Sequence, residues 1–169
     1  SLSDVGFADD IDETGETLEA NSLLKAQAVW DYLVGRQMQD KIDGVFSDDT
    51  GLEIRALGGQ PGVRTARWSG EPVDHARNRQ KALAELRGKE DRKARFRTVV
   101  TLIRDGKAEQ VEGIVEGEIA TEEWGGNGFG YDPLFIPKGY TKTFAQLSAD
   151  IKNSISHRAR AIQALCKIL

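Results

Sequence analysis

The sequence has little cysteine and no long apolar segment. Its one cysteine, Cys166, excludes an internal disulfide and fits a reducing compartment. No apolar run approaches the roughly 18–20 residues that a membrane-spanning helix needs. The first ten residues, SLSDVGFADD, lack the basic and apolar regions of a signal peptide. We therefore expect a cytoplasmic protein that does not enter a membrane.

An excess of positive charge is also missing. The chain has 23 Lys and Arg residues against 27 Asp and Glu residues, a formal net charge of −4. This balance argues against a general partner of nucleic acid or of an anionic membrane, because such binding depends on clustered cations. The sequence contains no Cys/His metal spacing, no P-loop and no Gly-x-Ser-x-Gly turn. The composition predicts a small-ligand site that uses a metal and a few local cations.

The residues that are present suffice for one domain. The 169 residues show no internal repeat or linker, so we expect a single domain over 1–169. Helical and strand periodicities predict an α/β fold with a mixed, twisted central sheet flanked by helices. Asp105-Gly106 predicts a two-residue hairpin turn. The expected helices cover 17–34, 74–87 and a last segment from Ser154 or Ser156, and the expected strands cover 44–48, 94–103 and 109–119.

Two apolar stripes predict which faces of the helices are buried, since residues three and four apart lie on one side of a helix. Thr14 or Thr17 is the expected cap of the first helix. In the last strand, Gly113 and Gly117 predict either a bulge or close backbone packing. The stripes are formed by Leu18, Leu24, Ala28 and Trp30 or Tyr32 in the first helix, and by Ile162, Leu165, Cys166 and Leu169 in the last.

Paired carboxylates stand where the strand 44–48 runs into the sequence DDTG. Asp48 and Asp49 would repel each other there, so a cation is their natural partner. In a strand they point to opposite faces, and only one of them would meet a ligand. A hard divalent ion held by such a carboxylate can bridge phosphates and activate water. The alternative is an ordinary Asp-rich turn, which a lone DDTG favours.

A glycine-rich segment, GGNGFGYDP, covers 125–133. Glycines let the backbone approach a flat ligand, and Phe129 or Tyr131 could stack on it. The alternative is a flexible connection whose aromatic rings cover the edge of the core.

Cations open the last helix in the segment KNSISHR. Lys152, His157 and Arg158 stand where the helix dipole is positive, so they oppose it unless an anion or a carbonyl group binds there. The alternative is a solvated basic turn that tethers Asp150. Elsewhere, Asp12-Glu13 and Lys25 indicate by themselves only an acidic loop and a surface lysine, and His75 is expected on the surface.

The order of these segments carries more information than any one of them. DDTGLEIRALGGQPGVRTARWSG, then GFGYDPLFIP, then KNSISHRARA closely resembles the inosine triphosphate pyrophosphatase family, also called Ham1-like. The segment DETGETLEANSLLKA has a counterpart in the expected position. The resemblance covers essentially the whole chain. It implies an ITPase-like fold, a homodimer and hydrolysis of ITP, dITP or XTP to the monophosphate and pyrophosphate with Mg²⁺.

The resemblance also implies roles for individual residues. Asp49 matches the general base and a metal ligand, and Asp12 stands where the second metal-binding carboxylate falls, next to Glu13. The expected substrate-binding residues are Thr50, Lys25, Phe129, Gly130, Tyr131, Asp132, Lys152, His157 and Arg158. His157 and Arg158 would recognise the 6-oxo group of the purine, because both can donate hydrogen bonds to it.

The family begins with a strand, a T/S-x-N-x-x-K loop and a helix, which this sequence does not contain. We therefore expect the protein to have about thirty further residues, the scale of a βα unit, that supply a phosphate-binding loop. The alternative function is a nucleotide-binding module that does not catalyse hydrolysis. A pyrophosphatase for other bases fits the GFGYDP and SHR motifs less well.

Overall fold

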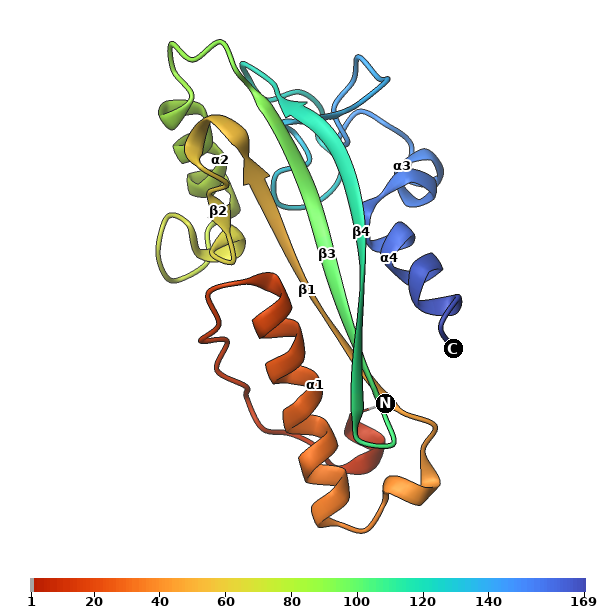
Figure 1. Ribbon diagram of the computed structural model, residues 1–169. Coiled ribbons are helices and arrows are strands. Elements are labelled where there is room, and N and C mark those ends of the chain that lie inside the picture. The colour runs from red at the N-terminus through yellow and green to blue at the C-terminus, as the bar shows by residue number, and fades with distance from the viewer. Residues whose placement is uncertain (1) are drawn as a thin grey trace.

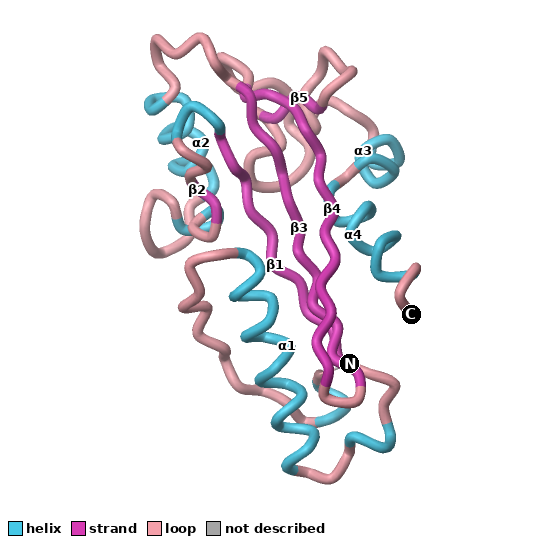
Figure 2. Tube along the Cα trace, in the orientation of Figure 1, coloured by secondary structure: helices cyan, strands magenta, loops and turns pink. Residues whose placement is uncertain are grey.

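Three long strands form the frame of the molecule. The computed structural model describes residues 2–169. Figure 1 shows β1, β3 and β4 running side by side through the molecule, and Figure 2 shows the same strands with the short β5 at one end. The helices are α1 (Leu18–Gly35), α2 (His75–Glu85), α3 (Ala149–Ile155) and α4 (His157–Cys166). The strands are β1 (Val45–Ile54), β2 (Pro61–Gly62), β3 (Lys93–Arg104), β4 (Lys107–Ile119) and β5 (Phe135–Pro137).

The sheet has the order β2-β1-β3-β4-β5, and every pairing described in it is antiparallel. The α/β class is confirmed, but the sheet described is not the mixed one expected. Periodicity identifies strands without giving their relative direction, and antiparallel neighbours need only short connections. The predicted hairpin is present, because both Asp105 and Gly106 have the positive φ that a type I′ turn requires.

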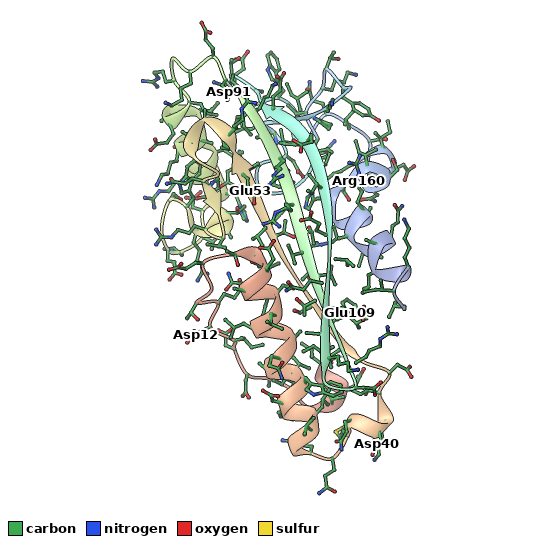
Figure 3. The ribbon with its side chains drawn as sticks, in the orientation of Figure 1. Asp12, Asp40, Glu53, Asp91, Glu109 and Arg160 are labelled. Carbon is green, nitrogen blue, oxygen red and sulfur yellow. The ribbon has the colours of Figure 1, made fainter. Side chains whose placement is uncertain are left out.

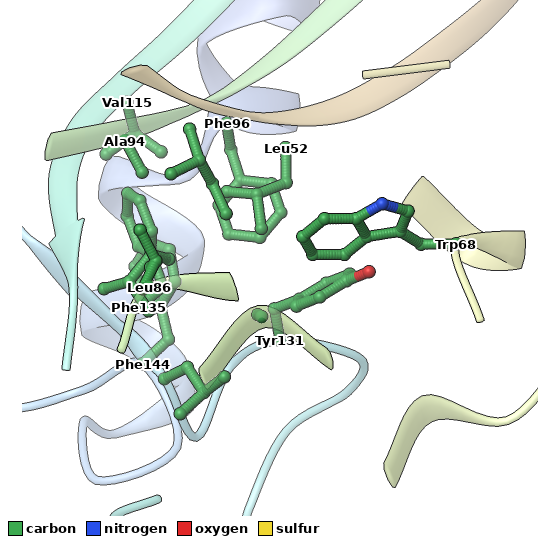
Figure 4. Close-up of a cluster of buried hydrophobic side chains, with 13 residues drawn as sticks. Leu52, Trp68, Leu86, Ala94, Phe96, Val115, Tyr131, Phe135 and Phe144 are labelled. Atoms are coloured by element: carbon green, nitrogen blue, oxygen red, sulfur yellow. The ribbon is translucent and has the colours of Figure 1, made fainter. Parts of the chain in front are cut away.

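Helices lie on both faces of the sheet. Side chains alternate between the two faces of a strand. The side chains of Ser47 on β1 and Thr101 on β3 both contact Ser22 of α1, the former by donating to the Ser22 carbonyl oxygen, which places α1 on their face. Helices α2 and α4 pack on the other face. The larger core also lies there, with Leu52 and Phe96 facing Leu86, Tyr131 and Phe135 in Figure 4. Between residues 2 and 169, no helix has the length and apolar character required to cross a membrane.

The buried face of α1 is not the predicted apolar stripe. Thr17 is the cap, and its hydroxyl accepts a hydrogen bond from Ala20 N at 3.1 Å. Leu18 is buried as expected, but Leu24 is exposed. The helix instead buries a different apolar stripe, which includes Ala26, Val29 and Leu33, and the polar residues Asn21 and Ser22 beside it bond to a loop and to the sheet. Its buried residues are Leu18, Asn21, Ser22, Ala26, Val29 and Leu33.

The last helical segment is divided at Ser156, whose extended backbone ends α3 and whose hydroxyl caps α4. Of the predicted stripe only Leu165 is buried. Ile162, Cys166 and Leu169 are exposed. Ala161 takes the central position because the helix lies so close to the sheet that only a small side chain fits.

Gly113 explains this close approach. A Cβ at Gly113 would lie under 3.0 Å from the His157 carbonyl oxygen and from the Ala161 nitrogen. The pairing of β4 with β3 continues without a break through Thr98 and Gly113. Of the two predicted reasons for this glycine, close packing is therefore the one observed.

Candidate active site

Asp48 and Asp49 lie within β1, not in a turn after it. The strand continues to Ile54 because this segment pairs with β3, where Asp48 faces Val100 and Asp49 faces Val99. The two carboxylates point to opposite faces, as predicted. Asp48 Oδ2 lies 3.2 Å from Arg158 Nη2 on α4, whereas Asp49 Oδ1 lies 3.0 Å from Lys25 Nζ on α1. One strand therefore serves two polar clusters.

The cluster on the α1 face contains a buried carboxylate. Asp49 is 9% exposed, and burial raises its pKa above the ordinary value, although the Lys25 ammonium acts in the opposite direction. Lys25 also contacts Glu13 Oε1 at 3.1 Å. Burial would lower the pKa of Lys25, but hydrogen bonds and charge from the two carboxylates hold it above its usual range. The structure thus brings one ammonium between two carboxylates.

These carboxylates are suitable ligands for a hard divalent ion. In the described part of the chain, no three His, Cys, Asp or Glu side chains are grouped to hold a metal by themselves. Magnesium commonly binds through one or two carboxylates together with substrate phosphates, so Asp49 and Glu13 fit such an ion. Asp12 is exposed on the loop before α1, as Figure 3 shows. Glu13 is the acidic residue of this pair that reaches Lys25.

A pocket of about 340 Å³ lies on the other face of β1. It brings together segments that are far apart in the sequence: the β1 strand, the glycine-rich loop and the start of α4. Thr50 lines it and exchanges a hydrogen bond with Thr98 at 2.8 Å between their hydroxyl oxygens. Most of the predicted substrate-binding residues are in its wall, namely Thr50, Phe129, Gly130, Tyr131, Asp132, Lys152, His157 and Arg158.

The two aromatic residues of the glycine-rich loop have different environments. Tyr131 is buried, and its hydroxyl donates to the Thr65 carbonyl oxygen at 2.7 Å. This bond joins two segments that line the pocket. Phe129 is 72% exposed and remains available for stacking. Asp132 closes the loop, because its Oδ2 accepts from Phe129 N at 2.6 Å and is ion-paired with Lys152. Lys152 therefore pairs with Asp132 and not with Asp150, the partner that the alternative interpretation expected.

His157 presents an unpaired polar atom in the pocket wall. Its ring stacks on Phe96 with centroids 4.9 Å apart, and its buried Nδ1 has no hydrogen-bond partner within residues 2–169. Burial lowers its pKa to about 4, and the charges of Arg158 and Lys152 act in the same direction. The imidazole is consequently neutral near pH 7 and has one N–H donor to offer a ligand.

We expect His157 to titrate near pH 4 in the folded protein. Because this pKa lies below the ordinary 6.5, the unfolded chain takes up the proton first. The titration of His157 therefore leaves the free energy of unfolding unchanged above about pH 6.5 and lowers it as the pH falls from 6.5 toward 4. NMR of the ring protons measures the titration, with His75→Ala assigning the signals of the two histidines. A midpoint at or above 6.5 would contradict the described environment.

Sequence reasoning missed several residues of the pocket. His75 is half-buried rather than on the surface, and its ring contacts Phe129 edge-on with centroids 4.5 Å apart. Thr65, Asn153 and Ser156 also line the wall. The sequence does predict the helix that begins at His75, since Asp74 caps it. Its rotation toward the glycine-rich loop depends on tertiary packing that no local pattern records.

The fold and this divided site define an α/β protein in which one strand joins the cluster of Asp49, Lys25 and Glu13 to a pocket lined with aromatic residues. The chain belongs to the Ham1 family, whose model matches residues 1–168.

Two curated relatives illustrate the similarity. A dITP/XTP pyrophosphatase of Flavobacterium johnsoniae is 44% identical over 169 residues, which cover 100% of this chain and 84% of the relative. A dITP/XTP pyrophosphatase of Bacillus subtilis is 48% identical over 172 residues, covering 100% of this chain and 83% of the relative.

Solved structures show the same fold. The Ham1 protein of Staphylococcus aureus has a TM-score of 0.88 and 38% identity, covering 99% of this chain and 83% of that one. A nucleoside-triphosphatase described as a dITP/XTP pyrophosphatase, from Mycobacterium abscessus, has a TM-score of 0.79 and 39% identity, covering 97% and 81%.

Proposed function

We propose that this protein hydrolyses the non-standard purine nucleoside triphosphates dITP, XTP and ITP, giving the monophosphate and pyrophosphate. The observation that carries the proposal is the position of Asp49 and Thr50 on one strand. Asp49 belongs to the carboxylate cluster, and Thr50 lines the aromatic pocket on the other face. Relatives that are 44% and 48% identical and are named dITP/XTP pyrophosphatases support the same activity over a binding module without catalysis.

In this proposal the pocket holds the nucleoside. Phe129 stacks on the purine base, which leaves the edge of the base toward His157 and Arg158. Neutral His157 donates one hydrogen bond to the 6-oxo group, where adenine presents a donor amine. A site built for such bonds disfavours a mismatched base, because its own polar groups are then left unpaired.

The carboxylate cluster carries out the hydrolysis in this proposal. Asp49 accepts a proton from the attacking water, and Lys25 offsets negative charge on the phosphates. Asp49 and Glu13 would hold Mg²⁺, which when bound neutralises phosphate charge and lowers the pKa of water. Lys152 holds Asp132 and thereby the loop that carries Phe129. The homodimer, the cytoplasmic location and the absence of nucleic-acid partners stay predictions.

A substrate panel tests the function. We expect pyrophosphate release from dITP, ITP and XTP at kcat/KM values well above those for dATP and ATP. Equal rates on all purine triphosphates would contradict the base-recognition account, and binding of dITP without turnover would support the non-catalytic alternative.

We expect His157→Ala to weaken discrimination between ITP and ATP. The loss of one hydrogen bond to the base predicts about a three- to tenfold fall in the ratio of their kcat/KM values. Arg160→Ala is a suitable control, since Arg160 is on the same helix but donates to the Ile114 carbonyl oxygen. An unchanged ratio of the kcat/KM values for ITP and ATP in His157→Ala would show that His157 does not take part in base recognition.

The choice of second metal ligand can be tested with neighbouring carboxylates. We expect Glu13→Gln to raise the Mg²⁺ concentration needed for half-maximal rate by about tenfold or more. Mutating a residue that only hydrogen-bonds to a metal ligand already lowers metal affinity about 10- to 100-fold, so loss of a direct ligand should cost at least as much. Asp12→Asn should change it little. The reverse pattern, measured by Mg²⁺ titration of the rate and by calorimetry, would restore Asp12 to the role that the family resemblance implies.

A further inference from the structure

Helix α2 presents three consecutive polar contacts to the loops that form the pocket. Asn78 and Arg79 follow His75 by three and four residues, so each of them lies on the same side of the helix as His75. The proposed reaction assigns no role to any of them. Their side chains reach both walls of the pocket, which the sequence places more than fifty residues apart.

Asn78 fixes the nearer wall. It is fully buried, its Nδ2 donates to the Ala66 carbonyl oxygen at 2.7 Å, and its Oδ1 accepts from Ser69 N at 2.7 Å. Thr65 and Ala66 line the pocket within this segment. The position of α2 relative to this wall is thus fixed by a buried amide that is hydrogen-bonded through both its nitrogen and its oxygen.

Arg79 reaches the farther wall. Its Nη1 donates to the Gly130 carbonyl oxygen at 3.0 Å, and its Nε donates to Glu123 Oε1 at 2.9 Å. Gly130 has a φ of 59°, a conformation that glycine adopts without strain. The guanidinium therefore joins Gly130 of the glycine-rich loop to Glu123, two residues before that loop begins.

His75 contacts Phe129, the residue next to Gly130. Its ring meets Phe129 at 67°, and both rings line the pocket. Phe129 is mostly exposed, so its ring has few other contacts: His75 meets the ring itself, whereas the bonds at Gly130 and from Phe129 N to Asp132 hold the backbone beside it.

We propose that His75 and Arg79 are positioning residues that hold the glycine-rich loop ready to receive the purine base. The proposal rests on the proposed function, because it assumes that Phe129 stacks on a nucleotide base. When only a fraction of the molecules has the loop in the binding-competent conformation, the apparent Kd equals the intrinsic Kd divided by that fraction. Neither residue belongs to the Asp49 cluster, so their loss raises KM and leaves kcat nearly unchanged.

The test compares variants on dITP as substrate. His75→Ala is expected to raise KM about three- to tenfold. Arg79→Ala is expected to raise it about tenfold or more, since its bonds are charge-assisted. Both should keep kcat within about twofold. His75→Phe retains an aromatic ring against Phe129 and should restore KM. Arg77→Ala, an exposed cation on the same helix, should match the wild type.

The outcomes separate the two proposals. If the wild type does not hydrolyse dITP, the proposed function fails and this inference fails with it. If it does, KM values for His75→Ala and Arg79→Ala equal to that of Arg77→Ala overturn the inference alone, as does a fall in kcat at constant KM. Should Arg79→Ala fail to fold, the His75→Ala and His75→Phe pair decides, because His75 is only half-buried.

Discussion

Replacing Asp49 with asparagine is expected to abolish most turnover of dITP while leaving the fold intact. General-base catalysis typically contributes about 10²- to 10⁴-fold in rate, and kcat should fall by that order. The asparagine amide has the shape of the carboxylate, but it carries no negative charge. It therefore neither accepts the proton of the attacking water nor binds a cation strongly. Because burial raises the pKa of Asp49, the charged form is unfavourable in the folded protein. The variant should stay folded, because Glu13 still pairs with Lys25 at 3.1 Å.

Asp48→Asn is the matched control for this experiment. Asp48 is the adjacent residue of the same strand, but it points to the other face and pairs with exposed Arg158. Exposed pairs contribute little to stability, about 0–1 kcal/mol. We expect this variant to retain most of the wild-type kcat. Near-full turnover by Asp49→Asn, or an equal loss in both variants, would contradict the role of Asp49.

Gly113→Ala is expected to have the largest effect on stability. The added Cβ would overlap the backbone of His157 and Ala161 at the start of α4, and backbone atoms cannot move aside like a flexible side chain. Overpacking of this kind typically costs about 1–3 kcal/mol. For a domain of this size each kcal/mol lowers the melting temperature by about 2–4 °C. His157 and Arg158 would move with the helix, so KM should rise at temperatures where the variant is folded.

Gly35→Ala provides the comparison, since a Cβ at Gly35 would meet nothing within 4 Å. Alanine is a better helix former than glycine, so this change should be neutral or slightly stabilising. Thermal denaturation followed by circular dichroism measures both variants. A Gly113→Ala protein as stable as the wild type would contradict the close seating of α4 on β4.

The parts of the fold that the sequence predicts correctly depend on local geometry. The opposite directions of Asp48 and Asp49 follow from the two-residue period of a strand. The hairpin at Asp105-Gly106 follows from the backbone conformations that this turn requires. Thr17 is one of two candidate caps, with Thr14, because a hydroxyl before a helix satisfies a free N–H group.

The parts that were not predicted depend on how elements pack. The rotation of α1 buries Ala26, Val29 and Leu33 and brings the Ser22 hydroxyl to the sheet, and hydropathy alone does not favour this stripe over one through Leu24 and Ala28. The buried face of α4 centres on Ala161 because Gly113 brings the helix close. His75 enters the pocket through the placement of α2 against a loop more than fifty residues away. The choice between Asp12 and Glu13 likewise depends on the path of a loop, which residue types alone do not determine.

The identity of the products tests the central proposal most directly. We predict that ³¹P NMR of dITP incubated with the protein and Mg²⁺ shows dIMP and pyrophosphate as the only phosphorus-containing products. Release of inorganic phosphate together with dIDP would mean cleavage at the terminal phosphate and would contradict the account. So would dITP that remains intact under conditions in which calorimetry shows it bound.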